Sequence, residues 1–550
     1  MPADLVLTNA NVYTVDAARS RAEALAIKDG RIVAVGTAAD VEHLIGGRTQ
    51  VLDVGRRLVL PGFIDSHMHA QSGVEGLYAL PLHDAQSRDD CLRALATFAG
   101  GHPEMTAIRG GGWPASMIRE DELLATQIDA VVGDRPVMLS DDSYHLAWVN
   151  SAALRLAGID ARTPEPDNGV IDRLPDGSPS GLLREGPVSL VERVLPRFTV
   201  EQVAEGLLHF QTTVAGPYGL TTVQDAGVKV DDPALEGYSL LQQQDRLTAR
   251  YCISMWLMED RPLDEQVAAL RAEHKRQIGP LVRMRTAKLY ADGVIEGHTG
   301  YLNEPYADSP GDRGQPMCPP EQFTAMAVAV ATAGLQIHIH AIGDAAVSMS
   351  LDAIEAAERA GGGDAVARPL ITHLELVDPA DFSRFATLGV VAVPQPYWFH
   401  KETMFHEILV PFLGKSRAER QYPMKSFWDH GVVVASASDY PVSPPPDPLL
   451  AIQRGVLRRV PERSAQPAAL WPEEAVTVEQ MIESFTINGA FANFLEEETG
   501  SIEVDKSADL IVLSRDILAC PPEEITEAQV ELTVFAGRPV YAGGPFAGLT

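Results

Sequence analysis

The sequence predicts an α/β fold built on a TIM-like (β/α)8 barrel. The middle of the chain alternates short apolar segments with longer helical ones, which is the pattern of βα units around a parallel sheet. Eight apolar segments can be counted, and eight parallel strands are the number that closes a TIM barrel. The candidate strands are residues 58–67, 219–227, 248–256, 283–293, 335–344, 368–377, 389–398 and 431–442.

The two ends of the chain differ from the middle, because short segments rich in β-branched residues dominate there. DLVLTNANVYTV and ALAIKDGRIVAVG stand near the start, and GSIEVDKSADLIVLS and LTVFAGRPVYAGG stand near the end. Chain ends often lie close together, so we expect residues 1–58 and 490–550 to form one small β-sandwich domain. The barrel then spans 59–489. The gap after its first strand is too long for one βα connection and predicts an inserted subdomain at about 75–215.

Charge and cysteine content exclude several classes of partner and site. Asp and Glu number 75 against 44 Lys and Arg, and the net charge of −31 repels phosphate backbones and anionic membrane surfaces. We therefore expect a small-molecule substrate, with no nucleic acid and no membrane as partner. Four isolated cysteines argue against a disulfide scaffold or a thiolate zinc site. The start lacks signal-peptide features, which favours a cytoplasmic protein, and a homo-oligomer (dimer) is also expected.

A pair of histidines follows the first candidate strand, in the stretch PGFIDSHMHA at positions 61–70. Residues i and i+2 of a strand face the same side, so His67 and His69 would project together and could bind a metal ion. Two solvated histidines would give the same pattern. The interpretation therefore depends on the other strand ends, because a TIM barrel carries its chemistry at the C-terminal ends of its strands.

Further metal-binding residue types occur at those strand ends. In chain order they are Lys288 on the fourth strand, His338 and His340 on the fifth, His373 on the sixth and Asp439 on the eighth. Neutral imidazoles and carboxylates are ligands of divalent metals. A lysine among them fits if carbon dioxide carboxylates its amine, because that reaction turns a cation into a bridging anion.

Each of these residues also has a simpler explanation when it is taken alone. His373 could be a satisfied histidine of the core, Asp439 in SDYP could cap a helix or turn, and Lys288 could pair with Asp292. Chance is a poor account of all of them standing at strand ends in one order. The joint pattern therefore favours a divalent metal centre.

With these motifs the chain resembles the amidohydrolase superfamily, specifically its YtcJ-like branch. The matching stretches cover essentially the whole chain: PGFIDSHMHA, SDDSYHLAWVNSAAL, GSPSGLLREG, GLTTVQDAG, AKLYADGVIEGHTG, HAIGD, THLEL, SASDYPV and GSIEVDKSADLIVL. The resemblance implies a TIM-like barrel, a β-sandwich made from both chain ends, and a hydrolase that holds one or two divalent metal ions, commonly zinc.

The resemblance also implies a role for each candidate ligand. His67 and His69 are similar to the ligands of the deeper metal, and His340 and His373 are similar to those of the second metal. Lys288 is similar to the carboxylated lysine that bridges the two metals in binuclear relatives. The number of metal ions is thus linked to the chemical state of this lysine.

Three further residues complete the expected centre. Asp439 resembles the aspartate that binds metal and accepts the proton of water, so it is the expected catalytic residue. His338 lies on the same strand face as His340. It is expected to contact the ligands without binding the metal itself, although it could replace His340 as the ligand. Asp292 is likewise expected to contact the ligands and not the metal.

Four residues are candidates for substrate contact. Trp398 lies in PQPYWFH after the seventh strand, and Trp113 and His145 lie in the insert, in RGGGWP and SYHLAW. Packing between barrel and insert would explain the aromatic residues equally well. His298 in DGVIEGHTG stands where much of the branch has an arginine, which would suit an anionic group. We therefore expect an apolar or aromatic substrate.

Together these expectations describe a metal-dependent hydrolase that cleaves an amide or related C–N bond of a small molecule. A bound metal lowers the pKa of its water toward ~7, and the resulting hydroxide would attack a carbonyl while Asp439 moves the proton. The same scaffold could instead serve a hydratase, isomerase or decarboxylase, since fold does not fix the reaction. A non-catalytic regulatory homologue is a further alternative, and the complete ligand set argues against it.

Overall fold

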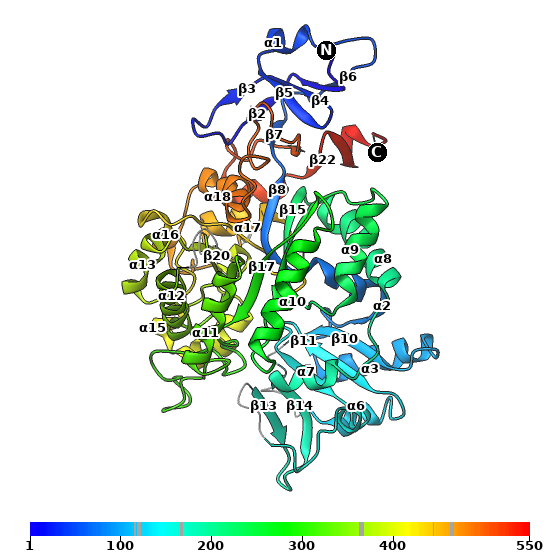
Figure 1. Ribbon diagram of the computed structural model, residues 1–550, viewed down its shortest axis with the longest axis vertical. Helices are drawn as coiled ribbons and strands as arrows, with labels where there is room; N and C mark the ends of the chain where they lie inside the picture. The colour runs from blue at the N-terminus through cyan, green and yellow to red at the C-terminus, as the bar shows by residue number, and fades with distance from the viewer. Residues whose placement is uncertain are drawn as a thin grey trace.

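The computed structural model describes residues 1–114, 117, 123–164, 169–361, 368–443, 445–461 and 467–549. Its central feature is a seven-stranded parallel sheet (Figure 1). The strands follow one another in chain order, and each pairs with the next in parallel register. They are β8 (Phe63–Met68), β15 (Leu220–Val228), β16 (Arg250–Trp256), β17 (Val282–Tyr290), β18 (Gln336–Ala341), β19 (Leu370–His373) and β20 (Val391–Pro394).

The sheet closes into a barrel through residues 432–438, which run between the last strand and the first. On one side, Ala435 donates a backbone hydrogen bond to the carbonyl of Ala392 at 2.9 Å. On the other side, Ser66 donates to the carbonyl of Ser436 at 3.2 Å. The predicted TIM-like barrel is confirmed. The eighth segment, however, is an extended chain without a regular ladder, because it pairs with its neighbours only at isolated points.

The predicted first strand, residues 58–67, is in fact two strands that meet at Gly62. β7 (Leu58–Pro61) belongs to a sheet formed by the chain ends, whereas β8 enters the barrel. A Cβ atom on Gly62 would lie 2.3 Å from Oγ1 of Thr221, so the crossing needs glycine. The sequence prediction was wrong here because both strands are apolar and buried, and periodicity alone does not separate them.

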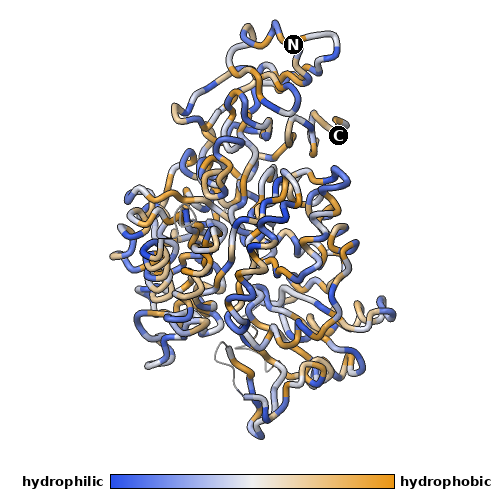
Figure 2. The backbone as a smooth tube through the Cα atoms, in the orientation of Figure 1, coloured by the Kyte–Doolittle hydropathy of each residue, from blue (hydrophilic) through white to orange (hydrophobic). Residues whose placement is uncertain are grey.

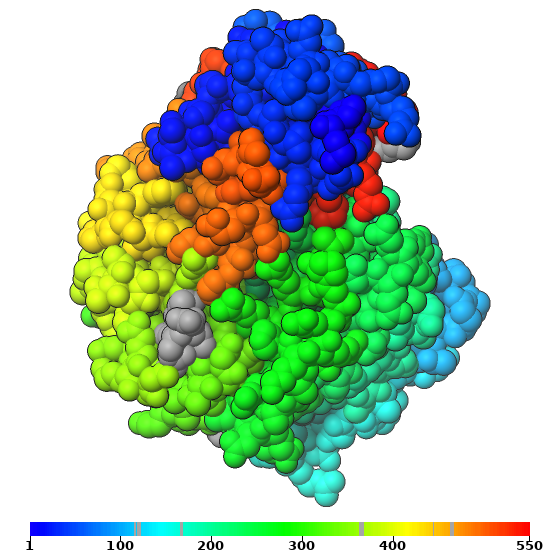
Figure 3. Space-filling model, turned by 45° about the horizontal axis from the view of Figure 1, so that its top comes forward, coloured from blue at the N-terminus to red at the C-terminus, as the bar shows by residue number. Residues whose placement is uncertain are grey.

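The two chain ends build two sheets next to one end of the barrel (Figures 1 and 3). Their strands, besides β7, are β1 (Leu5–Thr8), β2 (Asn11–Tyr13), β3 (Arg21–Ala22), β4 (Ala24–Lys28), β5 (Arg31–Gly36), β6 (Gln50–Asp53), β21 (Leu510–Leu513), β22 (Val530–Phe535) and β23 (Arg538–Ala542). One sheet has the order β5–β4–β1–β6, and the other has the order β23–β22–β21–β7–β2–β3. Both contribute to one hydrophobic cluster that includes Leu7, Ile27, Val59, Leu510 and Val534.

An insert between β8 and β15 carries a sheet of its own, at the end of the molecule away from the terminal sheets (Figure 1). Its strands are β9 (Leu80–Pro81), β10 (Ile108–Trp113), β11 (Val137–Asp141), β12 (Leu146–Val149), β13 (Gly169–Arg173) and β14 (Pro179–Glu185). They pair in the order β13–β14–β12–β11–β10–β9. Buried Trp113, Leu139 and Trp148 belong to a hydrophobic cluster within the insert. The insert therefore has a core separate from that of the barrel.

Helices surround the sheets and bury one face each. In α12 (Asp344–Arg359), Val347, Leu351 and Ile354 are buried at the spacing of an amphipathic helix. Figure 2 shows the resulting alternation of hydrophobic and hydrophilic positions along the chain. The other long helices are α3 (Arg88–Gly101), α8 (Val200–Phe210), α9 (Pro233–Gln243), α10 (Leu263–Arg276), α11 (Pro320–Thr332) and α17 (Pro448–Leu457). Within the described part of the chain, no helix has the length and hydropathy to cross a membrane.

A buried ion pair connects the barrel with the terminal sheets and predicts a measurable loss of stability. Nη1 of Arg250, at the start of β16, lies 2.5 Å from Oδ2 of Asp509, and both side chains are nearly inaccessible. In Asp509→Ala, Arg250 keeps its charge without its partner, so the free energy of unfolding should fall by about 3–5 kcal/mol. Denaturant unfolding measures the difference.

The matched control is Asp429→Ala, which removes an exposed ion pair with Lys425 on one helix. This variant should cost at most about 1 kcal/mol, because exposed pairs gain little in water. Equal costs for the two variants would contradict the role given to the buried pair.

Candidate metal centre

Two of the predicted histidines converge on the predicted catalytic aspartate where the barrel closes. The Nε2 atoms of His67 and His69 lie 3.3 and 3.2 Å from the same oxygen, Oδ1 of Asp439. The backbone holds the two segments together, because the N–H of Asp439 donates to the carbonyl of His67 at 2.8 Å. His67 and Asp439 are buried, with 1% and 6% of their surfaces exposed.

His373 and His340 bring two more imidazoles to this point. Potential ligand atoms of His67, His373 and Asp439 all lie within 4.8 Å of one another. The ring of His340, on β18, has its centre 4.4 Å from that of His373, which ends β19. The five predicted imidazole and carboxylate ligands therefore meet at the C-terminal ends of the barrel strands.

The chemistry of this cluster fits a divalent metal ion. Oδ1 of Asp439 is buried without a hydrogen-bond partner among the described residues, which is costly for a carboxylate unless a cation compensates it. Burial, and then the nearby Lys288, lower the pKa of His67 well below its ordinary value, so its imidazole is neutral. Burial likewise lowers the pKa of His340 and of His373. Neutral imidazoles and a carboxylate are the donor set of hydrolytic zinc sites.

Each imidazole has one ring nitrogen engaged by a neighbour outside the cluster, and such contacts orient metal-binding histidines. They join His69 Nδ1 to the carbonyl of Ala226 (2.7 Å), His340 Nε2 to the carbonyl of Gly293 (3.0 Å), His373 Nδ1 to Oε1 of Gln395 (3.2 Å) and His67 Nδ1 to Nε2 of His338 (2.9 Å). His338 thus lies behind His67. The sequence analysis missed Gln395, although its position directly after β20 is a strand-end signal.

Lys288 and Asp292 lie beside the cluster and have different partners. Nζ of Lys288 is buried 3.4 Å from Nδ1 of His67, and burial lowers the pKa of this amine to about 7. The carboxylate of Asp292 accepts three backbone N–H groups, from Tyr301, Ile342 and Gly343, at 2.8, 2.9 and 2.9 Å. Asp292 therefore anchors the loop after β18, and its oxygens are occupied by backbone donors.

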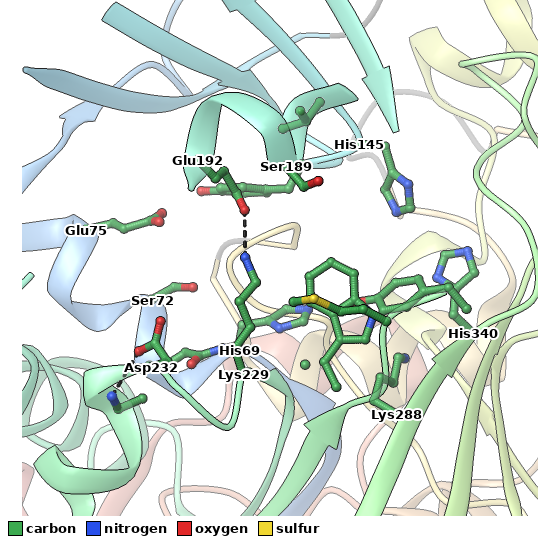
Figure 4. Close-up of a pocket in the computed structure, with 18 of the residues that line it drawn as sticks. His69, Ser72, Glu75, His145, Ser189, Glu192, Lys229, Asp232, Lys288 and His340 are labelled. Carbon is green, nitrogen blue, oxygen red and sulfur yellow. Dashed lines mark hydrogen bonds and ion pairs between the residues drawn. The ribbon is translucent and has the colours of Figure 1, made fainter. Parts of the chain in front are cut away.

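A cavity of about 370 Å³ opens from the cluster toward the insert (Figure 4). His69, Lys288 and His340 line it from the barrel, and His145 lines it from the insert. The ring centres of His145 and His340 are 5.2 Å apart, so the insert places a side chain next to the candidate ligands. A small molecule in this cavity would touch both parts of the chain.

His145 is held by a carboxylate that the sequence analysis missed. Nδ1 of His145 lies 2.7 Å from Oε2 of Glu185, and the hydroxyl of Thr299 donates to Oε1 of Glu185 at 2.6 Å. Burial alone would lower the pKa of His145, but the charge and hydrogen bond of Glu185 raise this pKa to about 9. His145 is therefore protonated at neutral pH. The available signal was the position of Glu185 at the end of β14, in GLLREG.

Apolar residues form another part of the cavity wall, and the sequence analysis missed them as well. Trp256, Met258 and Tyr290 line the cavity at the ends of β16 and β17. Tyr290 stands two residues after Lys288 and thus on the same strand face, and Trp256 ends the third predicted strand. The alternation of side chains along these strands could have identified both aromatic rings as residues that face the site.

The structure places the other predicted substrate contacts elsewhere. Trp113 is fully buried in the core of the insert, and its Nε1 donates to the carbonyl of Leu139 at 2.8 Å. Trp398 stacks against His373, with ring centres 5.8 Å apart. His298 stacks on the ring of Tyr306, with centres 4.5 Å apart. None of these three belongs to the described residues that line the cavity, so their contact with substrate stays a prediction.

The chain is similar to known proteins over nearly its whole length. It is 28% identical over 544 residues to the protein named "Putative amidohydrolase YtcJ" of Bacillus subtilis (strain 168), covering 96% of this chain and 98% of the relative. It is 30% identical over 559 residues to the N-substituted formamide deformylase of Arthrobacter pascens, covering 97% of each. The resemblance to the YtcJ-like branch is confirmed.

A solved structure supports the same conclusion for the fold. An uncharacterized metal-dependent hydrolase from Pyrococcus horikoshii OT3 superposes with a TM-score of 0.74 at 22% identity, covering 94% of this chain and 99% of that one. Residues 50–541 match the model of the family described as "Amidohydrolase family". This match spans more than half of the sequence, and the chain belongs to the amidohydrolase family.

Proposed function

We propose that the protein is a metal-dependent amidohydrolase that cleaves an amide or related C–N bond of a small molecule. The observation that carries the proposal is the cluster of His67, His373 and Asp439 at one end of a cavity of about 370 Å³. His67, His69 and Asp439 would hold a divalent ion, with zinc as the first choice. When bound, the metal supplies a Lewis acid that polarises a carbonyl and acidifies a water molecule.

Asp439 would act as the general base and then as the general acid. A carboxylate has two oxygens, so one oxygen of Asp439 can face the metal while the other accepts a proton from water and returns it to the leaving nitrogen. The low exposure of the carboxylate keeps bulk water from competing for that proton. The proton transfer therefore depends on this one side chain.

His145 would orient the substrate from the opposite wall. Glu185 binds its Nδ1, which leaves the second N–H of the protonated ring without a partner among the described residues. A cationic N–H donor next to the metal cluster suits the oxygen of an amide carbonyl. Thr299 supports this arrangement, because it donates to the other oxygen of Glu185.

The cavity favours an uncharged, partly apolar substrate over an anionic one. Trp256, Met258 and Tyr290 supply apolar contact area. Glu75 lines the cavity without an ion-pair partner among the described residues, and three basic side chains of the lining are paired with carboxylates, whereas Arg109 donates to the backbone carbonyls of Glu192 and Pro196. The three ion pairs are Lys229 with Glu192, Arg193 with Asp260 and Arg197 with Asp231. The name of the deformylase relative makes small N-substituted formamides the first substrates to try.

A second metal ion is part of the proposal. His340 and His373 would hold it, since their ring centres are 4.4 Å apart and the ring centre of His373 is 5.1 Å from that of His67. Lys288 would bridge both ions as a carboxylated amine, since burial favours the uncharged amine that reacts with carbon dioxide. Metal analysis distinguishes a site that holds one ion per chain from a site that holds two.

Removal of the metal is the experiment that tests the proposed function. Dialysis against a chelator should abolish hydrolysis of an N-substituted formamide, and zinc, cobalt or manganese should restore it, because the carbonyl is no longer polarised without the ion. His67→Ala should lose both metal and activity. His298→Ala, which lies outside the cavity, is the matched control and should keep its metal. Full activity in a verified metal-free sample would contradict the proposal.

Asp439→Asn tests the proton transfer separately from metal binding. Asparagine keeps the size and one oxygen of the side chain but cannot take up a proton, so kcat should fall by roughly 10²–10⁴-fold while metal content largely survives. Asp447→Asn is the matched control, because Asp447 caps α17 and asparagine caps a helix equally well. A near-normal kcat in Asp439→Asn would remove this residue from the mechanism.

Substrate preference can be measured with a matched series of amides that carry an aromatic, an aliphatic or a dicarboxylate group. The kcat/KM values should be highest for the aromatic and lowest for the dicarboxylate. Trp256→Ala should lower kcat/KM for the aromatic member by roughly ten- to hundredfold, since burying a side chain of this size is worth about 1.5–3 kcal/mol. Trp113→Phe, in the core of the insert, should not change the ranking. A preference for dicarboxylates would contradict the proposed cavity chemistry.

A further inference from the structure

Three of the four imidazoles in the metal cluster contact an oxygen that can only accept a hydrogen bond. For His69 and His340 this oxygen is a backbone carbonyl, at 2.7 and 3.0 Å. For His373 it is Oε1 of Gln395, whose amide nitrogen donates to the hydroxyl of Thr372 at 3.0 Å. In each ring the contacting nitrogen must carry the hydrogen, and the other nitrogen keeps its lone pair.

His67 is the exception, because its outer neighbour is another imidazole. Nδ1 of His67 lies 2.9 Å from Nε2 of His338, and Nδ1 of His338 lies 2.8 Å from the hydroxyl of Ser254. The amide nitrogen of Gln224 lies 2.5 Å from that hydroxyl, and the same amide turned by 180° presents its oxygen, which has no partner among the described residues, as an acceptor for the hydroxyl hydrogen. His338, Ser254 and Gln224 are all fully buried. An imidazole and a hydroxyl can each donate or accept, so this chain has two possible directions.

Only one direction leaves His67 able to bind a metal next to Asp439. In that direction His67 donates from Nδ1 to His338, and His338 donates from its own Nδ1 to Ser254. Nε2 of His67, which lies 3.3 Å from Oδ1 of Asp439, then keeps its lone pair. In the opposite direction a hydrogen occupies Nε2, and the nitrogen cannot act as a ligand.

We propose that His338 and Ser254 are positioning residues that hold the Nδ1–H of His67 and so direct its Nε2 lone pair toward the metal. This inference rests on the proposed metal-dependent function. The hydroxyl of Ser254 contributes because it accepts the hydrogen of Nδ1 of His338. Without this acceptor, no neighbour among the described residues favours the form of His338 that carries its hydrogen on Nδ1. Lys288 also approaches Nδ1 of His67, at 3.4 Å, but the contact with His338 is the shorter one.

A purely structural role for these buried polar groups is the competing explanation. Buried polar groups lower stability unless they are hydrogen-bonded, and apolar residues of similar size could fill the same space without this loss of stability. The barrel interior nevertheless contains an unbroken run of four polar side chains that ends at a proposed ligand. The two explanations differ in what they predict for metal affinity at constant stability.

The experiment measures zinc affinity by competition with a chromophoric chelator in His338→Leu, His338→Gln and Ser254→Ala. His338→Leu should weaken zinc binding by about 10–100-fold, the usual effect of removing an outer-layer partner. His338→Gln should stay close to wild type, because its amide oxygen accepts from Nδ1 of His67. Ser254→Ala should show an intermediate loss. The absorption spectrum of the cobalt-loaded proteins should change in the same order.

Ser484→Ala is the matched control, because it also removes a fully buried hydroxyl, whose hydrogen-bond partners among the described residues are Ser436 and Met481. It should keep wild-type zinc affinity. Thermal melting of all metal-free variants separates affinity from stability. Unchanged zinc affinity in His338→Leu and Ser254→Ala would overturn the inference, as would losses that merely follow the melting temperatures.

Failure of a variant to fold and failure of the wild-type protein to bind metal have different meanings. If His338→Leu does not fold, the comparison of Ser254→Ala with Ser484→Ala carries the test alone. If the wild-type protein itself binds no zinc or cobalt, the proposed function fails together with the inference. Wild-type binding with equal affinity in the variants refutes the inference alone.

Discussion

The closure of the barrel between β8 and the irregular eighth segment is the constraint on which the site depends. A backbone hydrogen bond of 2.8 Å joins the N–H of Asp439 to the carbonyl of His67. It fixes which residues of the two segments lie opposite each other. A shift by one residue would turn His67 to the opposite face, because strand side chains alternate. This hydrogen bond thus brings the carboxylate to the imidazoles at the place where the barrel closes.

The residues of the site lower the stability of the fold, and the surrounding structure offsets this loss. Lys288, Asp292 and Asp439 are buried ionisable groups, and burial raises the pKa of Asp292 to about 7. His373 and Asp439 also have left-handed backbone angles, with φ of 77° and 59°, which cost roughly 1–3 kcal/mol each for such residues. A large apolar core that includes Ile337 and Ile339 of β18 and Val347 and Leu351 of α12 packs against the barrel strands and supports these conformations.

The sequence predicts the barrel and the metal ligands because both follow from local rules. The spacing of His67 and His69 determines that they share a face, and a parallel barrel brings all its strand ends together. Local rules fail where tertiary packing decides. Gly62 divides one apolar run between two sheets, and Trp113 turns into the core of the insert because its indole finds an acceptor in Leu139.

Residues with an outer-layer role were the hardest to predict. Gln395 and Glu185 look like ordinary polar residues at strand ends, and their importance appears only when His373 and His145 are seen against them. His338 stood out in the sequence because it shares a strand face with His340. Its partner Ser254 lies on a different strand, so only the assembled barrel joins them.

The separate core of the insert has a consequence for how this protein can change. The candidate metal ligands come from the barrel, whereas His145, Glu185 and Glu75 belong to the segment that separates its first two strands. Because the two units are stabilised by different hydrophobic clusters, substitutions in the insert can remodel the cavity without disturbing the ligands. The wall of the cavity and the candidate metal centre can therefore change independently of each other in the course of evolution.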